Sequence, residues 1–385
     1  MSDPQKERVR IRTLIPSLNL GDFPPGPWNS LTDVPGVLVH TESIIAPRTD
    51  EHHEINTGVT AILPRRNVID SGVFASIFSF NGAGEMTGSH WLAETGLLHT
   101  PIAITGTLSV GAAHEGVTRY FIRETKDSNG LAPDFALPVV AETWDGFLSD
   151  AGALPVRPEH VVKAIDAASS DAVKEGNTGG GTAMMAHGLK AGTGSASRVV
   201  PVPEGWEGPQ KAFTIGVLVQ ANYGRLPQFR VGGVPVGRKL LEQGKARDGR
   251  KQEPIGPQKD GSIIVIVATD APLLPHQLHR IAKRATVGLA RVGGTGFNYS
   301  GDVFLAFSTA SEIPGSIVAE HAPRHKIPDT VADHEIDSLF AATADAVEES
   351  IYNAICMAQT TTGPLGRKVE AVDLEALKEA VEAHL

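Results

Sequence analysis

The sequence predicts a single layered α/β domain that spans residues 1–385. Short apolar runs rich in β-branched residues alternate with segments of helical periodicity, and no linker-like stretch separates them. The 41 glycines cluster, which indicates tight turns and places where backbone closely approaches backbone or ligand. A chain of 385 residues is ample for one large hydrophobic core.

Residues 1–50 are punctuated by proline and glycine, and we expect them to wrap over the surface. The apolar runs that follow are bounded by turn residues, as buried strands are. The predicted strands are Gly58 to Leu63, Val73 to Phe80, Leu137 to Glu142, Ala212 to Gln220, Ile263 to Thr269 and Val303 to Phe307.

Helical periodicity appears between these strands. Pro158 and Pro275 are each expected to open a helix, because proline is well tolerated in the first turn. The first helix is predicted to run through Val173 and the second through Leu289. A longer helix is predicted over 337–358 and a short one over 374–383.

Composition excludes several classes of function. The net charge is −10, so binding to a phosphate backbone is disfavoured, and we expect no nucleic-acid partner. The single cysteine, Cys356, excludes an internal disulfide and is predicted to be a packed side chain. No metal-binding spacing of histidines is present, so we expect no metal and no cofactor. Without a signal-like start or a long apolar stretch, we expect a cytoplasmic protein with no membrane partner.

A long polar segment from Gly244 to Gly261 has no periodicity and ends abruptly at Ser262, where the most apolar strand begins. Loops longer than about 12–15 residues are uncommon unless they are functional or flexible. On these features alone, a surface loop followed by a strand-initiating serine is the simpler interpretation.

Other polar groups lie at the ends of predicted strands. Asn222 follows one strand and could donate to an oxyanion, while Ser300 and Asp302 precede another and could orient a base. Each also suits an ordinary turn. The glycine-rich run Gly176 to Thr182 could hold an anion through backbone N–H groups, but closely packed backbone is the favoured interpretation.

Together these motifs resemble the DmpA-type serine aminopeptidases, peptidase family P1, which include L-aminopeptidase/D-amidases and β-peptidyl aminopeptidases. The resemblance spans most of the chain and lies in Lys259 to Leu273, Asn177 to Thr182, Gln220 to Gly224, Gly233 to Gly237 and Ser300 to Thr309.

This resemblance implies an αββα four-layer sandwich similar to the N-terminal-nucleophile hydrolases. It also implies self-cleavage between Gly261 and Ser262 into fragments 1–261 and 262–385, which stay paired and assemble into homo-oligomers, commonly tetramers. Ser262 then matches the nucleophile and Asn222 the oxyanion donor. Ser300 and Asp302 match a pair that orients the nucleophile.

For the substrate, the resemblance implies short peptides, amides or esters with a free N-terminal amine. Glu142 matches an acidic residue that receives the substrate ammonium. Trp144 stands where some relatives carry tyrosine, so an oxyanion donor from that side chain is in doubt.

Two alternatives remain open at this point. The ornithine acetyltransferases share the implied architecture and catalyse acyl transfer, but they use threonine where this chain has Ser262. An unprocessed, non-catalytic protein that holds a small anion in its glycine loops is the other alternative.

Overall fold

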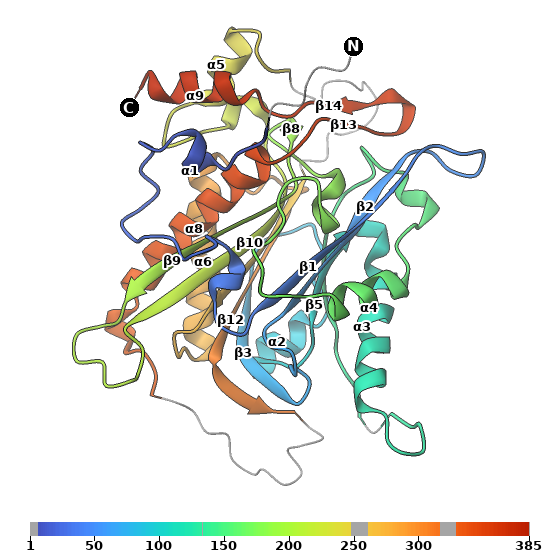
Figure 1. The fold of residues 1–385 in the computed structure, drawn as a ribbon, viewed down its shortest axis with the longest axis vertical. Helices are drawn as coiled ribbons and strands as arrows, with labels where there is room; N and C mark the ends of the chain where they lie inside the picture. The colour runs from blue at the N-terminus through green and yellow to red at the C-terminus, as the bar shows by residue number, and fades with distance from the viewer. Residues whose placement is uncertain (1–6, 133, 248–260, 316–328, 385) are drawn as a thin grey trace.

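Two β-sheets pack face to face in the computed structural model, and helices cover the outer face of each (Figure 1). The structure describes residues 7–132, 134–247, 261–315 and 329–384. The layers therefore follow the order helix, sheet, sheet, helix, which confirms the expected αββα sandwich.

The smaller sheet has the strand order β1-β2-β5-β6, with β5 and β6 parallel and the other pairs antiparallel. Helices α3 and α4 cover its outer face, where Val117 and Val161 join a core cluster with Val59 of β2. The bounds are β1 Leu38–Ala46, β2 Ile55–Leu63, β5 Ile102–Gly106, β6 Val139–Thr143, α3 Val110–Thr125 and α4 Pro158–Asp166.

The larger sheet has the strand order β4-β3-β12-β11-β10-β9, and the β11–β12 pair alone among these is parallel. Helices α6 and α8 contribute to the core on its outer face. The bounds are β3 Ser71–Gly82, β4 Leu97–Leu98, β9 Thr193–Pro201, β10 Ala212–Asn222, β11 Ser262–Thr269, β12 Gly301–Pro314, α6 Pro275–Val292 and α8 Asp337–Cys356.

Strand β11 shows how the layers are held together. Its odd-numbered residues Ile263, Val265 and Val267 join the core shared with α6 and α8. Its even-numbered residues Ile264 and Ile266 join the core between the two sheets. Because side chains alternate along a strand, a strand apolar on both faces is buried on both. The same alternation places Ser262 on the inner side, between the sheets.

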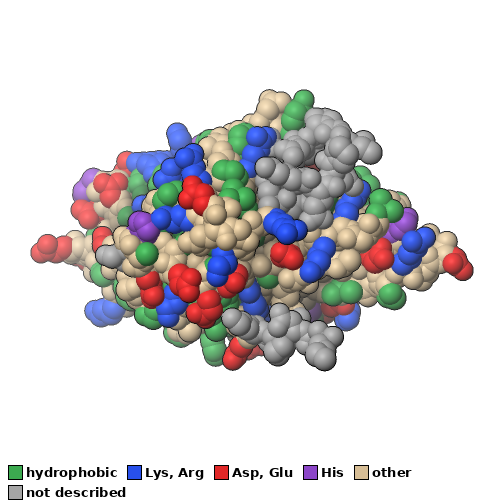
Figure 2. All heavy atoms as spheres, turned by 90° about the horizontal axis from the view of Figure 1, so that it is seen from above, with side chains coloured by type: hydrophobic (Ala, Val, Ile, Leu, Met, Phe, Trp, Pro, Cys, Tyr) green, Lys and Arg blue, Asp and Glu red, His purple; other side chains and the backbone are tan. Residues whose placement is uncertain are grey.

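Smaller elements gather at one end of the sandwich, and Figure 2 looks onto that end from above. Acidic and basic side chains lie side by side over the visible surface, without a stripe of one sign. The remaining bounds are α1 Ile11–Leu14, α2 Ser89–Thr95, β7 Met185–Ala186, β8 Leu189–Lys190, α5 Val236–Glu242, β13 Thr361–Thr362, β14 Lys368–Val369 and α9 Leu374–Glu382.

Two predictions about local structure are wrong. The described residues 7–50 do not simply cover the surface, because β1 is the edge strand of the smaller sheet and Ile11 and Leu31 are buried in the core. Helix α4 ends at Asp166 instead of Val173. Beyond it, the backbone of Ser169 exchanges hydrogen bonds with Val39, while its hydroxyl donates to Asp171. Such local bonds compete with helix continuation.

The prediction for Cys356 is confirmed, whereas the predicted long loop lies mostly outside the described residues. Cys356 is buried in α8, and burial raises the pKa of its thiol to about 12, so the packed side chain is confirmed. Most of the predicted loop lies outside the described residues, because 248–260 are not described. Among the helices of the described ranges, none combines the length and apolarity needed to cross a membrane.

Candidate active site

Ser262 is the first residue of β11, and only 6% of it is exposed. Its Oγ accepts a hydrogen bond from the backbone N–H of Gly301 at 3.0 Å. The preceding residue, Gly261, has a φ of +32°, in the region that favours glycine. The hydroxyl is therefore held in a fixed position, one residue after a glycine with unusual backbone geometry.

Asn222 lies directly opposite Ser262 in the antiparallel β10–β11 ladder. Its Oδ1 accepts a hydrogen bond from the backbone N–H of Met185 at 3.0 Å, and its Nδ2 donates to the carbonyl of Trp144 at 2.9 Å. These two contacts fix which end of the amide is oxygen and which is nitrogen. Because the amide nitrogen has two N–H groups and one acceptor among the described residues, the second N–H can meet a further acceptor.

Ser300 and Asp302 form a hydrogen-bonded pair at the start of β12. The Ser300 hydroxyl donates to Asp302 Oδ1 at 2.7 Å, and Asp302 is level with Ile263 in the parallel β11–β12 ladder. Burial raises the pKa of the Asp302 carboxyl to about 6. The pair thus lies one strand from Ser262, although the hydrogen bond to the Ser262 hydroxyl comes from Gly301 between them.

Glu142 is buried near the end of β6. Its carboxylate accepts hydrogen bonds from the backbone N–H of Glu85 at 3.0 Å and from the hydroxyl of Thr107. Burial raises the pKa of this carboxyl. A Cβ on Gly84 would lie 3.4 Å from Glu142 Oε1 and 2.9 Å from Gly301 Cα, so only a glycine separates the carboxylate from the Gly301 backbone.

Trp144 contributes to the site through its backbone. Its carbonyl accepts the hydrogen bond from Asn222, while the indole lies next to Gly146 and the residue as a whole is 38% exposed. The residue type at this position therefore leaves the Asn222 contact intact.

The sequence did not identify three contributors to this geometry: Gly301, Gly84 and Met185. Gly301 lies within a recognised motif, but a backbone N–H donor leaves no mark on residue type. Position 301 nevertheless requires glycine, because a Cβ there would lie 2.5 Å from Gly84 Cα. The close approach of Gly301 to Gly84, just beyond the end of β3, requires glycine at both positions, and the two glycines were the available signal.

The run from Gly176 to Thr182 is closely packed between the sheets. A Cβ on Gly180 would lie 2.2 Å from Gln220 Oε1, and one on Gly181 would lie 2.3 Å from the backbone nitrogen of Thr193. The N–H groups of Gly179 and Gly180 already donate to side-chain hydroxyls. The packing interpretation is therefore confirmed, and the anion cradle is not formed.

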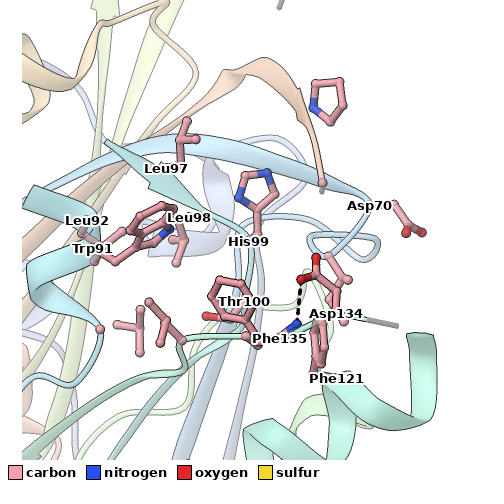
Figure 3. Close-up of a pocket in the computed structure, with 17 residues that line it drawn as sticks. Asp70, Trp91, Leu92, Leu97, Leu98, His99, Thr100, Phe121, Asp134 and Phe135 are labelled. Atoms are coloured by element: carbon pink, nitrogen blue, oxygen red, sulfur yellow. Dashed lines mark hydrogen bonds between the residues drawn. The ribbon is translucent and has the colours of Figure 1, made fainter. Parts of the chain in front are cut away.

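A separate cavity of about 290 Å³ lies at the opposite end of the larger sheet (Figure 3). It is lined by Asp70 and Pro314, next to the start of β3 and at the end of β12, with Trp91 and Phe135 on its walls. Gly301 lies at the other end of β12, and Ser262 lies beside it at the start of the neighbouring β11. Within the described ranges, no three histidine, cysteine, aspartate or glutamate side chains gather as metal ligands.

A buried strand that begins with serine, inside an αββα sandwich, is the arrangement of an N-terminal-nucleophile hydrolase. The chain belongs to peptidase family S58, whose family model matches residues 29–369. It is a hydrolase and a serine aminopeptidase, and its substrates are peptides or amides.

Named relatives agree with this assignment. The chain is 41% identical over 359 residues to the beta-peptidyl aminopeptidase BapA of Sphingosinicella microcystinivorans, covering 90% of this chain and 86% of the relative. A solved beta-aminopeptidase from Burkholderia sp. superposes with a TM-score of 0.86 at 40% identity, covering 97% and 99% of the two chains. The solved L-aminopeptidase D-Ala-esterase/amidase of Ochrobactrum anthropi is described as a variant of the Ntn hydrolase fold. It superposes with a TM-score of 0.85 at 40% identity, covering 97% of this chain and 98% of the relative.

Proposed function

We propose that the chain matures by cutting itself between Gly261 and Ser262. The Ser262 Oγ attacks the Gly261 carbonyl carbon, the C–N bond breaks, and an ester forms with release of the Ser262 nitrogen. Water then hydrolyses the ester, which leaves a carboxylate on Gly261 and a free α-amine on Ser262. The observation that carries this proposal is the Ser262 hydroxyl held by Gly301 N–H, with Asn222 directly opposite.

In turnover, the new α-amine acts as the general base for its own hydroxyl. An α-amine has a pKa of about 7.7–8.0, close to a neutral operating pH. Ser262 attacks the substrate carbonyl, and the remaining N–H of Asn222 stabilises the oxyanion. The leaving amine takes the proton, and water releases the acyl group from Ser262. Ser300 and Asp302 hold the strand next to the new terminus and orient it.

Glu142 is proposed to bind the ammonium of the substrate's N-terminal residue. The carboxylate is buried and close to Gly301, and a cationic group would compensate its charge. The substrates would be short peptides, amino acid amides or esters with a free amine. Because the relatives named above include β-aminopeptidases and an L-aminopeptidase, both β-alanyl and L-alanyl p-nitroanilides are the substrates to assay.

Mass spectrometry and N-terminal sequencing of the purified protein test the maturation step. We expect two polypeptides, the second beginning Ser-Ile-Ile-Val. Ser262→Ala should stay in one piece and lose at least about 10⁴-fold in kcat, as loss of a nucleophile does. Ser308→Ala is the matched control, since that buried serine lies in the same sheet and bonds the Ala271 carbonyl. An active enzyme in a single piece would refute the proposal.

We also propose that the cleaved pairs assemble into a homo-oligomer, a tetramer of pairs. The support is the family resemblance. Native mass spectrometry would give four copies of each fragment, and a particle with one copy of each would contradict this assembly.

A further inference from the structure

A short β-hairpin lies beside Asn222, and each of its strands, β7 and β8, has two residues. Its turn residues His187 and Gly188 have φ of +52° and +74°, as a type I′ turn requires. Met185 and Lys190 face each other across the hairpin. Two hydrogen bonds hold the hairpin against the end of β10. Met185 N–H donates to the Asn222 side chain, and His187 N–H donates to the carbonyl of Tyr223.

Lys190 has an unusual environment for a lysine, because it is fully buried with an exposed fraction of 0%. Its Nζ donates to the carbonyl of Met184 at 2.9 Å and to that of Ala191 at 2.6 Å. Within the described residues, no carboxylate pairs with it. These two carbonyls stand at the open end of the hairpin, where Ala191 N–H also donates to Met184 O.

The number of hydrogen bonds made by Lys190 Nζ fits a neutral amine. A neutral lysine has two N–H donors, and two carbonyls accept them. Burial lowers the pKa of Lys190 to about 7, so the neutral form is accessible near neutral pH. A buried methionine or leucine would fill this space without the cost of burying an amine, so a purely space-filling role does not explain a lysine here.

We propose that Lys190 is a positioning residue that closes the hairpin and so presents the Met185 N–H to Asn222, keeping the amide nitrogen of Asn222 turned toward Ser262. This inference rests on the proposed role of Asn222 as oxyanion donor. Without the Met185 contact, the bond to the Trp144 carbonyl would be the one hydrogen bond left to hold the amide within the described part of the chain. An amide that turns over would present its oxygen to the developing oxyanion and repel it.

The test compares Lys190→Met, which removes both donors at similar length, with Lys190→Gln, which restores an amide donor. Activity is expressed per cleaved chain, with the cleaved fraction taken from intact mass. We expect Lys190→Met to lower kcat about 10- to 100-fold with KM within about twofold, since an oxyanion donor contributes about 10²–10³. Lys190→Gln should recover part of the loss. Val200→Ala, at a buried apolar position of β9 outside the hairpin, is the control for lost core packing, with kcat unchanged.

A double-mutant cycle with Asn222→Ala decides whether Lys190 acts through Asn222. We expect Lys190→Met to cause no further fall in kcat when Asn222 is already alanine. Additive losses, or an unchanged kcat in Lys190→Met, would overturn the inference while leaving the Ser262 mechanism intact. If Lys190→Met stays uncleaved, the same cycle is run with Lys190→Gln. An active Ser262→Ala enzyme would instead refute the proposed function itself.

Discussion

Two buried polar regions of this molecule differ in how their charges are compensated. In the first, between β9 and α8, Arg198 and Arg12 both bond Glu349 Oε2, at 2.8 Å and 2.7 Å. Burial would raise the pKa of Glu349, but the arginines outweigh it and hold that pKa below its ordinary value. In the second, at the Ser262 end, Glu142 and Asp302 are held by neutral donors, and burial raises both carboxyl pKa values.

The difference in charge compensation distinguishes a region that stabilises the fold from a region proposed to take part in the reaction. A buried carboxylate matched by arginines is complete within the chain and contributes to folding. Under the proposed function, each of the two carboxylates at the Ser262 end meets a cation, which is the substrate ammonium at Glu142 and the α-amine at Asp302. Four experiments test this contrast, from the largest expected effect to the smallest.

Glu349→Gln breaks the compensated cluster. The variant should lose about 3–5 kcal/mol of unfolding free energy, because Arg198 is left buried without its charge partner. Urea unfolding measures the loss. Glu312→Gln is the control, because its carboxylate is 83% exposed and 3.8 Å from Arg65, and it should change little. Equal stability of the two variants would show that burial does not distinguish these ion pairs.

Glu142→Gln tests the uncompensated region and should act on substrate binding. Glutamine can accept from Glu85 N–H and donate to Thr107, so the fold should keep its stability. We expect kcat/KM to fall about 100-fold, mostly through KM, because a charge-assisted contact to the ammonium is lost. Asp145→Asn is the control, since that buried carboxylate bonds Thr57. A KM that rises equally in both variants would count against Glu142 as the ammonium site.

Asp302→Asn tests the raised pKa, in the Ser262→Ala background where the α-amine should not form. The folded pKa of about 6 exceeds the ordinary value of 3.8, so the native state binds more protons between these values. The stability contributed by the neutral carboxyl is present below about pH 4 and is lost as pH rises through 6. The asparagine variant should therefore be more stable by about 3 kcal/mol at pH 7 and equal at pH 3.5. Parallel stability curves would contradict the shift.

Trp144→Phe should have the smallest effect. The Asn222 contact uses the backbone carbonyl, so kcat should change less than about threefold, in contrast to the 10²–10³ of a lost oxyanion donor. Steady-state kinetics on the two p-nitroanilides measure it. A fall in kcat as large as that of Asn222→Ala would show that the indole itself takes part in the reaction.

The sequence predicted most of the strands whose own residues are strongly apolar, although it missed the apolar and buried β5. Strands β2, β3, β6, β10, β11 and β12 all overlap predicted runs, because a strand buried on both faces must be apolar at successive positions. Strand β9 was missed because Thr193–Pro201 is built from glycine, serine and alanine around the buried Arg198. Its burial depends on partners elsewhere, such as Ser195 bonding the Val217 carbonyl, which no local pattern records.

The candidate site was predictable for a different reason. Ser262, Asn222, Ser300 and Asp302 lie at strand ends, and the sheet order brings those ends together. The sequence identified the residues but could not show their convergence, which depends on β11 and β12 running parallel. The sequence did not indicate Lys190, because no local pattern predicts that a lysine at this position is fully buried.

The strand order also bears on what a cut before Ser262 would do to the molecule. Strands β11 and β12 would belong to the shorter piece, yet they are inserted between β3 and β10, which belong to the longer one. Pulling the pieces apart would tear two hydrogen-bonded ladders and split the sheet into three. After such a cut, the two polypeptides would share one interleaved sheet. If the molecule then unfolded, each polypeptide would have to find its partner again by diffusion before it could refold.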